Sequence, residues 1–120
     1  DLTLEEVQQL SECFSRVGID AVIATNTTLS REAVAGLAHA DEAGGLSGKP
    51  VFAKSTEIVR QFRQALPADM PIIAAGGIMS AEDAMQKLEA GAQLIQIYSG
   101  LIYQGPKLIQ DIVKTIQKRR

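Results

Sequence analysis

The sequence predicts an α/β fold, in which helices connect neighbouring strands of one parallel sheet. Three short apolar runs, at residues 19–24, 71–75 and 93–97, have the length and composition of buried strands, and we expect helices to cover both faces of their sheet. Between these runs, apolar residues recur at three- and four-residue spacing, as in amphipathic helices. Each run ends in glycine or small polar residues. Because α/β folds bind ligands at the carboxyl ends of their strands, the sequence predicts a ligand site at one edge of the sheet.

The composition narrows the possible functions. The net charge is −2, whereas nucleic-acid surfaces carry a clear basic excess, so we expect no nucleic-acid partner. One cysteine, Cys13, and one histidine, His39, leave too few ligands for a Cys/His metal site, and we expect no metal. His39 falls in a predicted loop and is expected on the surface. No apolar run approaches the ~20 residues of a membrane span, and the acidic start does not resemble a signal peptide, so we expect a soluble segment without a membrane element.

The first helix is predicted to begin at Leu4. Thr3 and Glu6 have the spacing of a capping box, and Gly18 suits the residue that ends the helix. The strand at residues 19–24 follows directly.

A polar run, Thr-Asn-Thr-Thr, occupies residues 25–28 after the first strand. The core does not need four consecutive hydrogen-bonding residues, and an amide beside hydroxyl groups suits a polar ligand. The same residues also suit an Asx or Ser/Thr turn that caps the next segment. The pattern alone leaves both interpretations open.

A glycine-rich loop, Gly-Gly-Leu-Ser-Gly, is predicted at residues 44–48, after a stretch with a weak helical pattern at residues 29–42. Its backbone could approach a ligand closely, although the motif is neither a P-loop nor a dinucleotide fingerprint. Pro50 is well placed near the start of a helix over residues 50–66, and Pro67 ends it.

A glycine pair, Gly76-Gly77, follows the strand at residues 71–75, and Ser80 is predicted to cap a helix that ends near Leu88. A strand, a glycine turn and a helix start together form a geometry that binds anions, and the glycines would leave room for a ligand at the backbone. The pair could equally be a plain tight turn between strand and helix.

The last strand, at residues 93–97, leads into a short helical turn at residues 99–103, and Pro106 opens a final helix. Two neighbouring strand ends, this one and the one at Gly76-Gly77, could jointly hold one phosphate, as the last two loops of (β/α)8 barrels often do.

The three predicted strands are too few to close a barrel, which needs eight strands and about 200 residues or more. An open sheet of three such apolar strands would expose its edges. We therefore expect residues 1–120 to be the C-terminal part, about the last three strand–helix units, of a single (β/α)8 TIM barrel domain whose N-terminal part is absent.

Four motifs in order make the chain resemble the C-terminal third of a class 2, quinone-dependent dihydroorotate dehydrogenase. They are Asn-Thr-Thr-Leu-Ser-Arg at 26–31, Gly-Gly-Leu-Ser-Gly-Lys-Pro at 44–50, Ala-Gly-Gly-Ile at 75–78 and Tyr-Ser-Gly-Leu-Ile-Tyr-Gln-Gly-Pro at 98–106. The resemblance implies a barrel with FMN at the carboxyl ends of its strands. It also implies oxidation of dihydroorotate to orotate in pyrimidine (UMP) biosynthesis. In that family, a serine base takes the proton, the flavin takes the hydride, and a quinone reoxidises the flavin.

The resemblance also assigns roles to individual residues. It implies that Asn26 and Thr27 hydrogen-bond the pyrimidine substrate, and that five residues contact FMN, the last two at its phosphate: Thr25, Gly48, Gly77, Tyr98 and Ser99.

Several parts of the family pattern are missing from this sequence. The catalytic serine, the lysine that contacts the flavin, and the N-terminal helices that meet the membrane and quinone all lie upstream in the family. We therefore expect no catalytic residue in this chain, no activity without the rest of the barrel, and peripheral attachment of the whole enzyme to the cytoplasmic side of the inner membrane.

Two other functions fit parts of the pattern. Phosphate-binding barrels of another class, isomerases or synthases, also carry glycine turns near their last strands, although the motifs at residues 26–31 and 44–48 count against them. Alternatively, the chain is a non-catalytic half-barrel that associates with a copy of itself through its apolar sheet edges.

Overall fold

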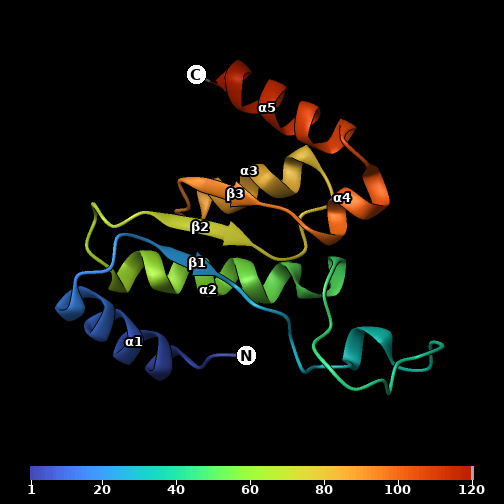
Figure 1. The fold of residues 1–120 in the computed structure, drawn as a ribbon, viewed down its shortest axis with the longest axis horizontal. Helices are drawn as coiled ribbons and strands as arrows, with labels where there is room; N and C mark the ends of the chain where they lie inside the picture. The colour runs from blue at the N-terminus through green and yellow to red at the C-terminus, as the bar shows by residue number, and fades with distance from the viewer. Residues whose placement is uncertain (120) are drawn as a thin grey trace.

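The computed structural model describes residues 1–119, which form a three-stranded parallel sheet with helices between the strands (Figure 1). None of the helices in this range is both long and apolar enough to cross a membrane. The elements follow in the order α1 (Leu4–Val17), β1 (Val22–Ala24), the 3-10 helices η1 (Glu32–Val34) and η2 (Lys49–Val51), α2 (Phe52–Ala65), β2 (Ile72–Ala75), α3 (Ala81–Glu89), β3 (Leu94–Gln96), α4 (Ser99–Gln104) and α5 (Lys107–Arg119).

The sheet has the strand order β1-β2-β3, so spatial order follows chain order. The register pairs Ala24 with Ala74 and Ala74 with Ile95, which makes the three strands end at nearly the same level. This confirms the predicted parallel α/β arrangement. Each strand is shorter than predicted: β2 has four residues, and β1 and β3 have three each.

The helices cover one face of the sheet only. Val22, Ile72 and Ala74 lie on the covered face and are buried. On the opposite face, the side chains of Ile23 and Leu94 are each 58% exposed. The expectation that helices cover both faces is therefore wrong for residues 1–119. The apolar composition of the strands predicted that both faces are buried, but the helices of this segment pack against one face.

Two apolar clusters hold the helices in place. In the first, α1 and α2 pack on β1 and β2 around Val7, Val59 and Phe62, and the rings of Phe14 and Phe62 stack with centroids 6.3 Å apart. The second cluster joins α3 to α5 and is made of Ile78, Ala84, Leu108 and Ile112. Because α2 also contacts α3, the two clusters form one continuous layer beneath the sheet.

The segment between β1 and the glycine-rich loop is mostly turns. Of the weak helical pattern at residues 29–42, only η1 (Glu32–Val34) forms a helix. Gly36 and His39 both adopt positive φ, which breaks a helix. The prediction that His39 lies on the surface is confirmed: its side chain is 78% exposed, and Nδ1 lies 2.6 Å from the carboxylate of Glu42.

The predicted capping box at the start of α1 is present. The hydroxyl of Thr3 accepts a hydrogen bond from the Glu6 N–H at 3.2 Å, and the Glu6 carboxylate accepts one from the Thr3 N–H at 2.7 Å. Hydrogen bonds from the backbone and hydroxyl of Thr3 lower the pKa of Glu6 below its ordinary value of 4.5. The stabilisation from this carboxylate is therefore present above pH 4.5 and is lost as the pH falls through the folded-state pKa.

We predict that Thr3→Ala frays the start of α1 in the full-length protein. Loss of an N-cap hydrogen bond costs about 1 kcal/mol, so hydrogen exchange at the first amides of α1 should accelerate about fivefold at neutral pH. Glu12→Ala, at an exposed position of the same helix, is the control and should leave these rates unchanged. Equal rates in Thr3→Ala and the wild type would contradict the role of the capping box.

Candidate functional site

A cleft of about 300 Å³ lies at the carboxyl ends of the three strands. It is lined by segments that follow β1, β2 and β3 and by the glycine-rich loop. All seven residues that the sequence singled out line this cleft: Thr25, Asn26, Thr27, Gly48, Gly77, Tyr98 and Ser99. The cleft is also lined by Gly76, from the predicted glycine turn, and by seven residues without a predicted role: Ser47, Val51, Ala75, Ile78, Gln96, Ile97 and Gly100.

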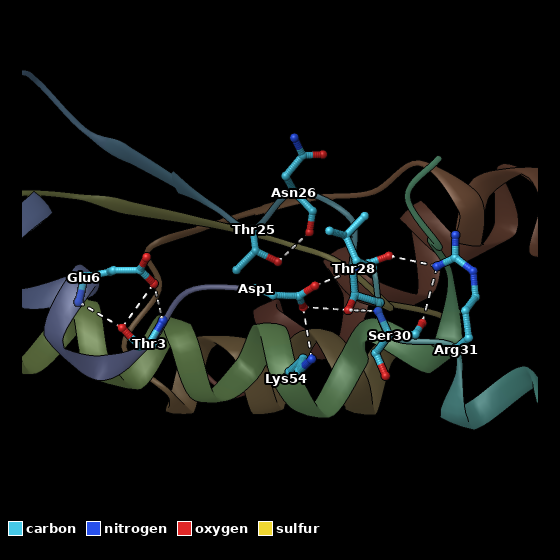
Figure 2. Close-up of polar contacts among 10 residues, drawn as sticks. Asp1, Thr3, Glu6, Thr25, Asn26, Thr28, Ser30, Arg31 and Lys54 are labelled. Atoms are coloured by element: carbon cyan, nitrogen blue, oxygen red, sulfur yellow. Dashed lines mark hydrogen bonds and ion pairs between the residues drawn. The ribbon is translucent and has the colours of Figure 1, made fainter. Parts of the chain in front are cut away.

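The polar run after β1 divides into two parts. Asn26 and Thr27 are exposed and line the cleft, and the Asn26 Oδ1 accepts a hydrogen bond from the Thr27 N–H at 2.8 Å. Thr25 donates its hydroxyl hydrogen to the Asn26 carbonyl at 2.9 Å. In Figure 2 the Asn26 side chain points away from the other labelled residues. These first residues present polar groups to the cleft.

Thr28 serves the local structure instead. Its side chain is buried, and its hydroxyl accepts a hydrogen bond from the Ser30 N–H at 3.1 Å, which is a Ser/Thr turn. Its backbone exchanges two hydrogen bonds with Leu46, at 3.0 and 2.8 Å, and so ties the polar run to the glycine-rich loop. The ligand interpretation therefore suits the start of the run, and the turn interpretation is correct for Thr28.

Asp1 anchors the polar run from beneath, a role that sequence reasoning missed. Its carboxylate accepts hydrogen bonds from the Thr28 hydroxyl at 2.6 Å and from the Leu29 N–H at 2.7 Å, and it pairs with Lys54 at 3.0 Å (Figure 2). No local sequence pattern predicts these contacts, because the partners of Asp1 lie 27 to 53 residues farther along the chain.

The glycine-rich loop packs directly against Thr27. A Cβ atom on Gly45 would lie 1.7 Å from the Thr27 hydroxyl oxygen, so only glycine fits there without moving Thr27. Gly48 adopts a φ of +80°, which glycine reaches without strain. The loop also reaches the end of β3, where the hydroxyl oxygens of Ser47 and Ser99 are 3.0 Å apart.

The glycine turn after β2 is shaped by the protein beneath it. Gly76 and Gly77 have φ values of +110° and +75°. A Cβ atom on Gly77 would lie 2.5 Å from the Cα of Phe52, at the start of α2. The expectation that glycine is needed here to leave room for a ligand is therefore revised: the close approach is between the turn and α2.

The ends of β2 and β3 meet at Gly100. This residue is buried in α4, and a Cβ atom on it would lie 2.1 Å from the carbonyl oxygen of Ile78. The contact fixes the start of α4, where Ser99 is the first residue, beside the Gly76-Gly77 turn. Within residues 1–119, the backbone N–H groups of Gly77 and Ser99 donate no hydrogen bond to the protein. Both remain available to an acceptor in the cleft.

The lining of the cleft contains amides, hydroxyls and backbone groups but no charged side chain. An anion bound there would be held by N–H and O–H donors, which is the chemistry of phosphate sites built from glycine turns and helix starts. The lining is also apolar in part, through Val51, Ile78 and Ile97, and would suit a planar ring.

Comparison with known proteins gives a consistent result. The family model for dihydroorotate dehydrogenase matches residues 1–119. A dihydroorotate dehydrogenase (quinone) from Shewanella pealeana is 56% identical over 95% of this chain and 34% of its own length, and one from Burkholderia cenocepacia is 55% identical over 100% of this chain and 35% of its own. A crystal structure of DHODH from Eimeria tenella in complex with ferulenol superimposes with a TM-score of 0.88 at 32% identity, covering 99% of this chain and 32% of that one.

We predict that Asp1→Asn loosens the polar run in the full-length protein. The amide keeps the size of the side chain but loses one acceptor oxygen, so hydrogen-exchange protection of the Leu29 amide should fall by about threefold to tenfold. Lys54→Gln removes only an exposed ion pair, worth about 0–1 kcal/mol, and should change protection much less. Equal protection in Asp1→Asn and the wild type would show that Asp1 does not hold this loop.

Proposed function

Because the chain belongs to the dihydroorotate dehydrogenase family, we propose that it supplies part of the active site of a quinone-dependent dihydroorotate dehydrogenase. The reaction would be the oxidation of dihydroorotate to orotate in pyrimidine biosynthesis, with bound FMN and a quinone as the electron acceptor. The observation that carries the proposal is the convergence of all seven expected contact residues on one cleft, in a chain about 55% identical to relatives of that name.

The segment would form part of a (β/α)8 barrel. The chain spans about a third of the length of the curated relatives that it matches. The exposed apolar side chains of Ile23 and Leu94 support this proposal, because further strands of a barrel would cover the face on which they lie. We propose that residues 1–120 are the C-terminal part of that barrel.

The residues of the cleft fit FMN. The free N–H groups of Gly77 and Ser99, with the Ser99 hydroxyl, match the acceptor oxygens of a phosphate, and the backbone of Tyr98 lies at the same strand end. Gly48 lies beside Ser99, because a Cβ atom on it would be 3.8 Å from the Ser99 Cβ. Thr25 lines the same cleft at the end of β1, and both residues would contact the cofactor. When bound, FMN supplies the acceptor for the hydride that leaves the substrate.

Asn26 and Thr27 would bind the pyrimidine. Dihydroorotate is a ring of amide groups with a carboxylate, so its edge needs both donors and acceptors. The Asn26 amide offers both, and the Thr27 hydroxyl adds a third polar group beside it. Gly45 packs against Thr27 and so fixes the position of that hydroxyl. These residues would orient the substrate against the flavin rather than move its proton.

The proton acceptor is proposed to lie outside this segment, because the lining of the cleft holds no Asp, Glu or His side chain that could take that role. The contact with quinone and the attachment to the membrane surface are likewise proposed for other parts of the enzyme. The family match along residues 1–119 excludes the alternative of an isomerase or synthase family.

The self-associating half-barrel remains a second candidate, and the open apolar face around Ile23 and Leu94 favours it. The two proposals differ in the flavin content of the protein. The full-length protein, purified under conditions that retain cofactors, should be yellow and show flavin absorbance with one FMN per chain. A colourless protein that binds no added FMN would contradict the proposed function.

We predict that Asn26→Ala in the full-length enzyme lowers turnover of dihydroorotate and leaves FMN bound. Loss of one or two hydrogen bonds to the substrate is worth about 1–3 kcal/mol, or about fivefold to 150-fold in kcat/KM. The control is Gln110→Ala, at an exposed position of α5. Loss of the flavin from Asn26→Ala would show that this side chain belongs to the cofactor site instead.

A further inference from the structure

Lys87 is completely buried in α3, yet the proposed chemistry does not use it. Its side chain has an exposed fraction of 0%, and it forms no ion pair with a carboxylate within residues 1–119. The nearby Asp83 instead accepts a hydrogen bond from the Met79 N–H at 2.9 Å. Burying a lysine without a charged partner destabilises the folded state, so the polar contacts that hold its amine are of interest.

The hydrogen bonds and the ring contact of the Lys87 side chain involve residues at the start of α2. Its Nζ donates a hydrogen bond to the Ser55 hydroxyl oxygen and approaches the Phe52 carbonyl oxygen at 3.4 Å. It also lies 4.8 Å from the centroid of the Phe52 ring, a cation–π distance. Lys87 thus joins α3 to the two residues of α2 that lie beneath the glycine turn.

Ser55 lies between Lys87 and the glycine turn and contacts both. Its hydroxyl oxygen lies 3.0 Å from the Phe52 carbonyl and 3.0 Å from the Gly76 carbonyl, but a hydroxyl group has only one hydrogen to donate. Lys87 has three hydrogens and can donate to both Ser55 and Phe52. With Lys87 in place, the Ser55 hydrogen is free to go to Gly76. The Phe52 carbonyl also accepts a hydrogen bond from the Thr56 hydroxyl at 2.7 Å. Without Lys87, the Ser55 oxygen would lose its donor, and the Ser55 hydrogen could turn from the Gly76 carbonyl to the Phe52 carbonyl of its own helix.

The position of the Gly76 carbonyl sets the direction of the next N–H group. Gly76 and Gly77 are joined by one peptide unit, so holding that carbonyl on one side holds the Gly77 N–H on the other. A Cβ atom on Gly76 would lie 2.9 Å from the Ser55 hydroxyl oxygen, which shows how closely the turn rests on this side chain.

We propose that Lys87 is a positioning residue for the phosphate of the cofactor: through Ser55 it holds the Gly76 carbonyl and thereby aims the Gly77 N–H into the cleft. The inference rests on the proposed function, because it assumes that FMN occupies the cleft. It adds a buried lysine and a serine that do not line the cleft to the residues that determine phosphate affinity.

The charge of Lys87 fits this role. Burial lowers its pKa to about 8, while Asp83 raises the pKa and Arg60 lowers it. The amine therefore remains mostly protonated at pH 7, with all three hydrogens available for donation. The charge also places a positive centre behind the turn, on the side away from the cleft.

The test compares FMN with riboflavin, which has the same ring but no phosphate. Full-length apoprotein is titrated with each ligand and flavin fluorescence gives the two affinities, for the wild type, Lys87→Met and Ser55→Ala. We expect both variants to lose about tenfold in affinity for FMN and to keep their affinity for riboflavin. The double variant should lose no more than either single one, because both changes break the same connection.

Met85→Ala is the matched control. Met85 is buried in the same helix but lies on the side of α5, so this change should lower thermal stability and leave the ratio of the two affinities as in the wild type. If Lys87→Met does not fold, Ser55→Ala, which removes a single oxygen atom, still measures the ratio. A wild-type ratio in a folded variant would overturn the inference alone. A wild-type protein that binds neither flavin would overturn the proposed function and the inference together.

Discussion

Parallel pairing of three strands in chain order is the constraint on which the site depends. The register that aligns Ala24, Ala74 and Ile95 brings three loops to one edge of the sheet. The first loop is closed by the pairing of Thr28 with Leu46, and it contacts the third through Ser47 and Ser99, while the second and third meet at Ile78 and Gly100. A shift of one residue in any strand would turn its side chains to the other face and separate these contacts. The cleft is therefore a consequence of the register rather than of any one loop.

The cleft contains no charge of its own, and the ionisable groups that shape it lie behind its walls. Asp1 holds the polar run from below, and Lys87 reaches the glycine turn through Ser55. An arrangement of this kind leaves neutral N–H and O–H donors facing a ligand, while charged groups fix the backbone that carries them. Hydrogen bonds from a rigid backbone lose little entropy when an anion binds, so the neutral donors of this segment suit a phosphate.

Local sequence patterns predicted the order of the elements and the residues at the strand ends, because both depend on neighbours in the chain. The capping box at Thr3 and Glu6 and the helix start at Ser80 are present where their motifs occur. The pattern at residues 29–42 misled, since the backbone there turns at Gly36 and His39. The exposed face of the sheet was not predictable either. Apolar residues in a strand indicate that it is buried, but they do not indicate which part of the protein covers each face.

Contacts between distant residues lay beyond sequence reasoning. Asp1 meets Leu29 across 28 residues, and Lys87 meets Ser55 across 32. Neither pair forms a motif, and a buried lysine looks in the sequence like any surface lysine of an amphipathic helix. The need for glycine at position 77 was foreseen, but its reason, contact with Phe52, emerged only from the fold.

A crystal structure of the full-length protein with FMN would show where the phosphate of the cofactor binds. We expect the phosphate oxygens within hydrogen-bond distance of the Gly77 and Ser99 backbone nitrogens, with the Ser55 hydroxyl donating to the Gly76 carbonyl. A phosphate bound elsewhere, with those two N–H groups facing solvent, would contradict the account.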